Sequence, residues 1–595
     1  MMDPILEVKN LAVDFPGVTT DSRIISGMSM SLKRGEILGL VGESGCGKSV
    51  FARTLVRLEY PGRIMSGSIT LDGMELTTQD QKGMGAFRGR RISLVMQNPE
   101  SSMDPVFTMG RQFREVLSIK PDSEDSGLKK GAGKNQKIHE FLQEVGITSP
   151  EERCRQYPHQ WSRGMLQRAQ LQMAFSTMPD VVIMDEITSA LDTTITAQIL
   201  QLISRLRNRN KTGIIFITHD ISVALEICDR IAVMQKGNIV ESGTASEIVF
   251  RPSHPYTKRL VSPVSVSEHV KARKEKGVTA PVISLRNLSV RFKSGVGKLF
   301  HRRSFHAVRD VSLDIGREEI LCLIGESGSG KTTLMNAILG FCAYQGGEII
   351  FDGQSVESPG DQTHQRLKHR AQVVFQDPAA SLSPYLSLEQ SILEPLVARG
   401  LNRKDRKDTG KRLAVEVGLS YTLLPQRPGR LSLGQNQRAC IARALSTGPD
   451  FLFLDEPLSA LDGLKQKEIA GLLAGLKTRH GLTCFLITHD LGLVKEIGTT
   501  VVVMYLGRIV EKAPMEGFFS NPLHPYSQAL LSSSLKPGLW KGDPIILEED
   551  IPSPHDPPSG CVFHPRCPGR LPVCEKSMPI RKDITEEHEV FCHLV

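Results

Sequence analysis

"GESGCGKS", residues 42–49, decides the fold of this chain, and it returns almost letter for letter as "GESGSGKT" at residues 325–332. Both stretches match Gly-x-x-x-x-Gly-Lys-Ser/Thr, and each follows an apolar run and precedes a helical pattern, which is the context that this motif requires. Glycine lets main-chain N–H groups turn inward around a phosphate at the positive end of a helix. The sequence therefore predicts two phosphate-binding loops.

The side chains of these loops predict a bound nucleoside triphosphate with Mg²⁺. Lys48 and Lys331 would neutralise the phosphates, and the hydroxyls of Ser49 and Thr332 would bind the metal ion. The other residues expected to surround the phosphates are Gly42, Ser44, Gly45, Cys46 and Gly47 in the first loop and Gly325, Ser327, Gly328, Ser329 and Gly330 in the second.

The two loops belong to an internal duplication. Matching segments lie 283 positions apart at the loops and 270 positions apart at the later pairs "IMDE" and "FLDE", "FITHD" and "LITHD", and "HPYT" and "HPYS". A polar, charged stretch separates the two copies, as a linker would. We therefore expect a first domain at 1–264, a linker at 265–281, a second domain at 282–540 and a cysteine-rich extension at 541–595.

The composition is that of a soluble globular protein, with 40% apolar and 23% charged residues. A length of 595 residues is enough for about three or four domains of ordinary size. No stretch reaches the roughly 20 apolar residues that cross a bilayer, and the first residues do not resemble a secretory signal, so we expect a cytosolic protein. The net charge of +8 is modest, and no nucleic-acid partner is expected.

Within each copy, short apolar runs alternate with helical patterns. Examples are the runs at 36–41, 181–186 and 214–218, and the helical pattern at 196–208. Continuous apolar strands that alternate with helices are typical of a largely parallel sheet covered on both faces. The predicted fold class is α/β.

Two carboxylates follow one apolar strand in each copy: Asp185 and Glu186, then Asp455 and Glu456. The aspartates suit support of Mg²⁺, and the glutamates suit orientation or deprotonation of an attacking water, because phosphoryl transfer needs mainly positioning and charge neutralisation. The alternative is an acidic strand end that caps a helix.

A histidine closes the next strand of each copy, His219 and His489, in "THD". A single histidine at such a place is usually structural. Its recurrence at the same spacing favours a contact with the γ-phosphate.

With these pieces in order, the chain resembles the ATP-binding-cassette ATPases over nearly all of both halves. The resemblance is carried by the two glycine-rich loops, the glutamines in "LVMQNP" and "VVFQDP", the signature segments "WSRGMLQRA" (161–169) and "LSLGQNQRACIARAL" (431–445), and "SALD" at 189–192 and 459–462. Other phosphate-loop families lack this ordered set.

The resemblance implies two tandem nucleotide-binding domains, each with a helical subdomain, that close head to tail into a pseudo-dimer within one chain. Each ATP would then lie between the phosphate loop of one domain and the signature of the other, which is formed by Ser162 and Gly164 or by Ser432, Gly434 and Gln435. Gln97 and Gln376 would sense Mg²⁺ and a membrane partner. Phe15 and Phe292 match the aromatic position that stacks on adenine in this family, although a strand phenylalanine is equally often part of a core.

The chain departs from the family signature at its first glycine, which is replaced by Arg163 in one copy and by Leu433 in the other. A side chain there would crowd the γ-phosphate, or it would point away and change little. Ile187 stands where the family usually places a proline after the catalytic glutamate. We expect unequal hydrolysis, with the site that pairs Lys331 with Ser162 the weaker one.

"HPYTKRLV" (254–261) and "HPYSQALL" (524–531) resemble a segment of the ATPases of oligopeptide, dipeptide and nickel importers. That resemblance implies the ATP-hydrolysing subunit of a binding-protein-dependent importer, peripheral to the cytoplasmic side of the plasma (inner) membrane, with two integral-membrane permease subunits and an external solute-binding protein as partners. Peptides, nickel and glutathione remain open as cargo. A docking groove is expected around residues 100–110, and a soluble ribosome-associated twin-cassette ATPase is the less favoured alternative.

The extension gathers four of the eleven cysteines: Cys561, Cys567, Cys574 and Cys592. Its surroundings are rich in proline, so we expect an inorganic crosslink to supply the order that packing cannot. Four thiolates suit a [4Fe–4S] cluster or tetrahedral Zn²⁺, and the missing C-x-x-C pair weakens zinc. Resemblance to the cysteine-bearing ends of dipeptide-importer ATPases favours the cluster; unligated thiols are the remaining alternative.

Overall fold

The computed structural model describes most of the chain in two compact units. The described residues are 3–15, 23–119, 132–189, 191–261, 281–293, 304–357, 360–400, 402, 405–459, 461–534, 545–547 and 551–595. They fall within 1–191, 195–263 and 462–464 for the first unit, and within 192–194, 264–461 and 465–595 for the second. The expected linker lies outside the described residues except for its last residue, as do positions 541–544 and 548–550 of the expected extension.

A six-stranded sheet forms the centre of the first unit, in the order β10-β9-β3-β8-β7-β6. Only β10 runs antiparallel to its neighbour. Every residue of β3, β7 and β8 is buried, so these strands are covered on both faces. The strands are β3 (Ile37–Val41), β6 (Ile92–Val95), β7 (Val181–Asp185), β8 (Gly213–Thr218), β9 (Arg230–Gln235) and β10 (Asn238–Thr244).

The second unit repeats this sheet and enlarges it to eight strands, in the order β16-β17-β18-β13-β19-β20-β22-β21. The strands are β13 (Ile320–Ile324), β16 (Ala371–Val374), β17 (Phe451–Asp455), β18 (Thr483–Ile487), β19 (Thr500–Tyr505), β20 (Arg508–Pro514), β21 (Lys582–Thr585) and β22 (His588–Val590). Alternate residues of β13 enter two different cores, Ile320 and Cys322 on one face and Leu321 and Leu323 on the other. The α/β prediction is confirmed.

Each unit also contains a four-stranded antiparallel sheet that the sequence analysis did not predict. The first is ordered β2-β1-β4-β5 and the second β12-β11-β14-β15. Their apolar residues alternate irregularly because the strand pairing shifts register at several points, which hides the usual strand pattern. The strands are β1 (Leu6–Asp14), β2 (Arg23–Leu32), β4 (Arg63–Leu71), β5 (Met74–Glu75), β11 (Ile283–Lys293), β12 (Ser304–Ile315), β14 (Gly346–Phe351) and β15 (Gln354–Ser355).

Helices follow the strands in nearly the same order in both halves. In the first half they are α1 (Lys48–Leu55), α2 (Pro99–Ser102), α3 (Met109–Leu117), α4 (Ala132–Glu144), α5 (Pro150–Arg153), α6 (Arg163–Ser176), α7 (Thr193–Asn210), α8 (Ile221–Ile227), α9 (Ala245–Phe250) and α10 (Pro255–Val261). In the second they are α11 (Lys331–Ile338), α12 (Gln362–Arg370), α13 (Pro378–Ser381), α14 (Leu388–Ala398), α15 (Arg406–Glu416), α16 (Leu433–Leu445), α17 (Gly463–His480), α18 (Leu491–Ile497), α19 (Met515–Ser520) and α20 (Pro525–Ser532).

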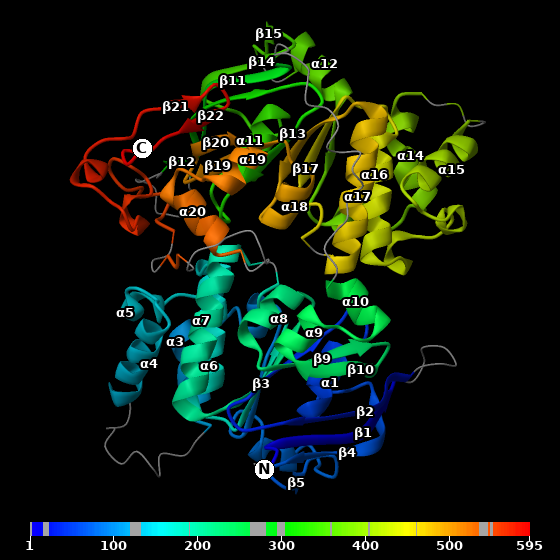
Figure 1. Ribbon diagram of the computed structural model, residues 1–595, viewed down its shortest axis with the longest axis vertical. Helices are drawn as coiled ribbons and strands as arrows, with labels where there is room; N and C mark the ends of the chain where they lie inside the picture. The colour runs from blue at the N-terminus through cyan, green and yellow to red at the C-terminus, as the bar shows by residue number, and fades with distance from the viewer. Residues whose placement is uncertain are drawn as a thin grey trace. The chain divides into compact units, whose positions relative to one another are not determined.

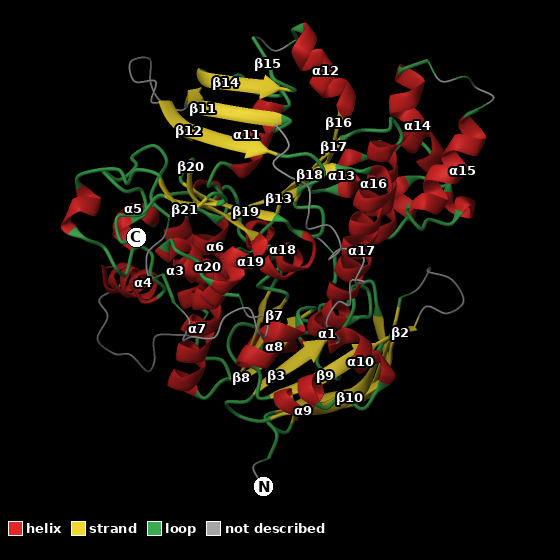
Figure 2. Ribbon diagram, turned by 45° about the horizontal axis from the view of Figure 1, so that its top comes forward, coloured by secondary structure: helices red, strands yellow, loops and turns green. Residues whose placement is uncertain are grey.

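A helical subdomain is visible in the second unit, where α14 packs against α15 and α16. These helices lie on one side of the unit, and the sheet of β11, β12 and β14 lies on the other (Figure 2). In the first unit α3 and α4 pack against α6 in the corresponding place. Among the helices that the structure describes, none combines the length and apolarity needed to cross a bilayer.

The C-terminal tail packs onto the second sheet, and this corrects the expectation that packing could not order it. β22 pairs antiparallel with β20, and the tail lies beside β20 and α20 in Figure 1. Two short 3₁₀ turns, at His564–Arg566 and Pro572–Glu575, precede this hairpin. Phe563, almost fully buried, places its ring 5.2 Å from that of Tyr505 and 5.3 Å from that of Tyr526. Val562 and Phe563 therefore pack into the core of the second unit, although prolines surround them in sequence.

Candidate nucleotide-binding and hydrolysis sites

The first phosphate loop joins β3 to α1, as predicted. Gly47 precedes α1 with φ of 109°, a left-handed conformation that favours glycine. A Cβ at Gly42 would lie 2.3 Å from the carbonyl oxygen of Met234, so this position also requires glycine. The buried Lys48 donates from Nζ to the carbonyl oxygens of Gly42 (2.7 Å) and Glu43 (2.9 Å), which curves the loop around the lysine.

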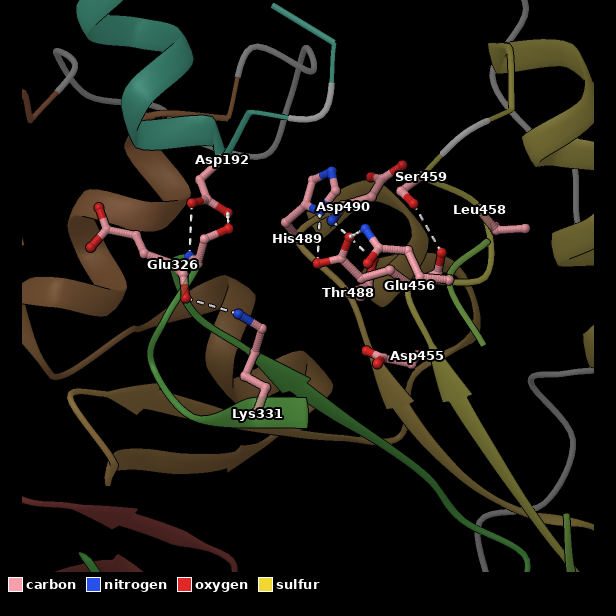
Figure 3. Close-up of polar contacts among 12 residues, drawn as sticks. Asp192, Glu326, Lys331, Asp455, Glu456, Leu458, Ser459, Thr488, His489 and Asp490 are labelled. Carbon is pink, nitrogen blue, oxygen red and sulfur yellow. Dashed lines mark hydrogen bonds and ion pairs between the residues drawn. The ribbon is translucent and has the colours of Figure 1, made fainter. Parts of the chain in front are cut away.

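The second phosphate loop repeats this geometry between β13 and α11. Gly330 has φ of 103°, and a Cβ at Gly325 would lie 2.2 Å from a carbonyl oxygen of β19. Lys331 donates to the carbonyl oxygens of Gly325 (2.8 Å) and Glu326 (2.9 Å; Figure 3). Burial lowers the pKa of Lys331, and nearby carboxylates oppose that shift. An anionic phosphate would stabilise the charged form of this lysine further.

The two predicted Mg²⁺ ligand pairs are brought together. Ser49 Oγ donates to Asp185 Oδ1 at 3.1 Å, and Thr332 Oγ1 donates to Asp455 Oδ2 at 3.2 Å. Burial raises the pKa of both aspartates, so a divalent cation beside them would offset the cost of keeping them ionised. Hydroxyl and carboxylate oxygens are the donors that Mg²⁺ prefers, and these residues therefore fit the ion.

Each candidate catalytic glutamate stands at a sharp turn after its strand. Glu186 has φ of 48° and Glu456 has φ of 45°, a conformation that costs free energy in a residue other than glycine and recurs in both units. A serine three residues later stabilises each turn. Ser189 Oγ donates to the carbonyl oxygen of Glu186 (2.7 Å), and Ser459 Oγ donates to that of Glu456 (3.0 Å; Figure 3). These serines were not predicted as site residues, although their repeated place in "SALD" was a signal.

The predicted glutamine and histidine converge on the glutamate in both units. Gln97 Nε2 donates to Glu186 Oε2 at 3.1 Å, and Gln376 Nε2 donates to Glu456 Oε2 at 2.9 Å. On the other side, the histidine Nδ1 lies 3.4 Å from Glu186 and 3.5 Å from Glu456 in the respective unit. The histidines are His219 and His489, and the second one is drawn in Figure 3.

These contacts keep the glutamates ionised. Burial opposes ionisation of Glu186 and Glu456, but the histidine and the phosphate-loop lysine outweigh it and lower the pKa of each carboxyl. Burial acts in the opposite sense on His219 and His489, and the glutamate beside each outweighs it and raises the pKa of the imidazole. An ionised carboxylate that is held by an amide and an imidazole is suited to orient a water molecule and accept its proton.

The signature serines begin helices. Ser162 Oγ accepts from the main-chain N–H of Met165 at the start of α6, and Ser432 Oγ accepts from that of Gln435 at the start of α16. Gln435 Oε1 in turn accepts from the N–H of Ser432, and methionine at the matching place in the first half cannot do so. Both serines are exposed and lie next to the replaced glycine, where Leu433 is also exposed. Their contact with nucleotide stays a prediction, as does the role of the buried Gly164 and Gly434.

The two predicted adenine-stacking residues differ. Phe15 is half-buried against the core of the first unit, which favours a core role. Phe292 is exposed, and its ring lies 5.9 Å from that of Phe305 on the neighbouring strand. Stacking on adenine stays a prediction for both.

The tail cysteines lie near one another. The N–H of Cys561 donates to the carbonyl oxygen of Cys574 at 2.8 Å, and the thiols of Cys561, Cys567 and Cys592 have pKa values that are raised by burial first and by the neighbouring thiols in part. Within the described residues, no three His, Cys, Asp or Glu side chains meet in a geometry that would hold a metal ion. The expected iron–sulfur or zinc centre therefore has no support from this geometry.

Comparison with known proteins places the chain in a family. The family model described as "ABC transporter" matches residues 25–189 and 308–459. The chain is 39% identical over 588 residues to the glutathione import ATP-binding protein GsiA of Escherichia coli (strain K12), which covers 92% of this chain and 93% of that protein. The chain belongs to the ABC transporter family. It is a fused twin-cassette ABC ATPase, which confirms the fold and the ATP-hydrolysing activity predicted from the sequence.

Further matches refine the subfamily of this ABC ATPase. The model described as "Oligopeptide/dipeptide transporter, C-terminal region" matches residues 240–308 and 510–574, which include both His-Pro-Tyr segments. GsiA of Salmonella typhimurium (strain LT2) is 38% identical over 589 residues and covers 92% of this chain and 93% of its own. Among solved structures, the dimeric ATP-binding cassette MJ0796 bound to ADP and Pi is 26% identical with a TM-score of 0.36, and it covers 39% of this chain and 98% of that chain. The predicted oligopeptide/dipeptide importer subfamily is confirmed.

Proposed function

We propose that this ABC ATPase drives import of glutathione or a similar short peptide, through two integral-membrane permease subunits, from the cytoplasmic side of the plasma membrane. One observation carries the proposal: the tyrosine of the His-Pro-Tyr segment, which is typical of peptide importers, accepts a hydrogen bond from the phosphate loop in both cassettes. The N–H of Glu43 donates to Tyr256 Oη (3.0 Å), and the N–H of Glu326 donates to Tyr526 Oη (2.8 Å). The subfamily segment therefore acts on the residues that would hold ATP.

The proposed roles at each site follow from the contacts. The phosphate-loop lysine and main-chain N–H groups would bind the phosphates of ATP. Ser49 with Asp185, or Thr332 with Asp455, would hold Mg²⁺, which would supply charge neutralisation at the phosphates. Glu186 or Glu456 accepts a proton from the attacking water. His219 or His489 keeps that glutamate ionised and would contact the γ-phosphate. We further propose that the two cassettes close head to tail, so that each signature serine completes the opposite site.

Contact with the permeases is proposed at one matched position in each cassette. Val106 and Tyr385 each follow the glutamine of their cassette by nine residues and expose 69% and 82% of their surface. Exposed apolar side chains at equivalent places of two domains suit insertion into a partner protein. Val106 lies in the segment 100–110 that the sequence analysis expected to dock.

Glutathione is proposed as cargo because the relatives that align along nearly all of this chain are glutathione import proteins. The test is uptake of radiolabelled glutathione by cells that carry this chain with its permeases and external binding protein. Lys48→Ala and Lys331→Ala variants should abolish uptake. Competition by unlabelled dipeptides or Ni²⁺ in place of glutathione would reassign the cargo, and co-purification with ribosomes in place of membrane proteins would overturn the import function.

For the tail we propose a metal-bound state with Cys561, Cys567, Cys574 and Cys592 as thiolate ligands. The effect of neighbouring thiols on the pKa values of Cys561 and Cys567 motivates it, since a cation would offset the cost of ionising buried sulfur. The described side chains do not themselves meet in a metal-holding geometry, so binding would require them to move. The test is metal and sulfide content, with the visible absorbance, of protein purified without oxygen. Iron with sulfide would indicate a cluster, zinc alone a tetrahedral site, and neither would leave the thiols unligated.

A further inference from the structure

The C-terminal tail reaches the phosphate loop of the second cassette through Arg566. Its Nη1 donates to Glu326 Oε2 at 2.6 Å, and its Nη2 donates to Glu326 Oε1 at 3.0 Å. Both side chains are almost fully buried, at 2% and 1% exposure. A bidentate guanidinium fixes the direction of the carboxylate as well as neutralising it. Arg566 therefore belongs structurally to a loop that lies 240 residues before it.

The main chain of Glu326 makes two further hydrogen bonds that fix the phosphate loop. Its N–H donates to Tyr526 Oη, and its carbonyl oxygen accepts from Lys331 Nζ at 2.9 Å. The carboxylate of Glu326 is close enough to Lys331 to act on its pKa. The carboxylate also accepts from the hydroxyl of Thr194, which carries no charge. Without Arg566, a buried negative charge with no cation to neutralise it would therefore stand near the lysine that binds phosphate. That charge would compete with ATP for Lys331 and repel the phosphates.

The first cassette has the same glutamate without this partner. Glu43 is half-exposed and keeps the main-chain contact with Tyr256, but among the described residues no hydrogen bond or ion pair reaches its carboxylate. An exposed carboxylate is solvated by water and needs no buried cation. The two phosphate loops, alike in sequence, thus differ in how their glutamate is neutralised.

A second part of the tail touches the opposite end of the same predicted nucleotide site. The ring of His555 lies 4.5 Å from that of Phe305, which in turn pairs with Phe292, the predicted adenine-stacking residue. The tail therefore contacts both the second phosphate loop and the strand beside the predicted adenine-stacking residue.

We propose that Arg566 is a positioning residue for ATP binding at the second site: it neutralises and orients Glu326 so that Lys331 remains available to phosphate. Nucleotide binding by the second cassette then depends on the tail, whereas binding by the first does not. The proposal rests on the ATPase activity of the family and goes beyond it by making the two sites unequal in a stated direction.

The test is photolabelling of the full chain with radiolabelled 8-azido-ATP over a range of concentrations, followed by proteolytic separation of the two cassettes. The first cassette is then an internal control in every sample. Arg566→Met should raise the half-saturating concentration of the second cassette by about tenfold or more, as expected when one member of a buried charge pair is removed. Arg566→Lys should raise it less, because lysine keeps the charge and loses the bidentate geometry.

The double variant Arg566→Met with Glu326→Gln separates positioning by charge from simple support of the fold. It removes both buried charges, so labelling of the second cassette should return to within about threefold of the unmodified chain. It also keeps the test informative if Arg566→Met alone unfolds the tail. Arg570→Met, which removes an exposed arginine of the same tail, is the matched control and should leave labelling of both cassettes unchanged.

Three results would overturn the proposal. Equal loss of labelling in both cassettes would indicate a general loss of fold, to be compared with the thermal unfolding of each variant. Unchanged labelling of the second cassette in Arg566→Met would show that the loop needs no such partner. Failure of Glu326→Gln to restore labelling would show that the unpaired charge is not the cause.

Discussion

Replacement of Phe563 by alanine should destabilise the second cassette although the residue lies in the tail. The ring is 1% exposed and contacts the rings of Tyr505 and Tyr526, as well as that of His524 at 5.6 Å. Truncation of a buried phenylalanine costs about 3–5 kcal/mol. For a cassette of some 250 residues, that loss corresponds to a fall in melting temperature of roughly 6–20 °C.

The assay is calorimetric unfolding of the full chain, with limited proteolysis to identify the cassette that opens first. Phe341→Ala is the control, because Phe341 is 59% exposed and its loss should change stability by no more than about 0.5 kcal/mol. Equal melting temperatures for Phe563→Ala and Phe341→Ala would refute the reasoning, since they would mean that the tail is not part of the core of the second cassette. Early proteolysis confined to the tail would refute it in the same way.

Three further predictions concern catalysis, pH and the phosphate loop. Glu186→Gln and Glu456→Gln should each lower phosphate release by about 100-fold or more, with the smaller loss for Glu456→Gln, and equal losses would rule out unequal sites. Burial lowers the pKa of His524 from 6.5 to about 4. The unfolded chain therefore binds a proton at a higher pH than the folded chain, so stability should fall as pH falls from 6.5 to about 4, and denaturant unfolding of His524→Asn should show a weaker fall in that window. Gly42→Ala should abolish labelling of the first cassette because its Cβ would lie 2.3 Å from a carbonyl oxygen, while Gly471→Ala, which meets nothing within 4 Å, should leave it unchanged.

Much of the site could be predicted because its residues follow strands. The parallel strands of each central sheet end at the same edge, so Ser49, Asp185 and Glu186, which are far apart in sequence, had to lie together once the strands were recognised. The hydrogen bond between Ser49 and Asp185 confirms that proximity. The internal duplication also helped to identify the histidine. His219 recurs as His489 at the same 270-residue spacing as the strands that precede them.

The sequence did not reveal contacts that depend on tertiary packing. Arg566 lies in a proline-rich stretch with no periodic pattern, and its partner Glu326 is 240 residues away, so neither local propensity nor motif spacing pairs them. The left-handed turn at Glu186 is likewise invisible, because glutamate carries no preference for that conformation. The second sheet of each unit was missed because its register shifts break the regular alternation of apolar residues.

The hairpin of β21 and β22 also determines which strand forms one edge of the second sheet. The described border strand is the short β21, whose residues are mostly exposed and polar, and such strands resist pairing with other chains. A chain shortened before residue 582 would instead leave β20 at the border, with Glu511 and Lys512 no longer paired to a neighbouring strand on that side. Truncated forms of the chain should therefore aggregate through this exposed strand edge. Affinity tags are for the same reason better placed at the amino terminus.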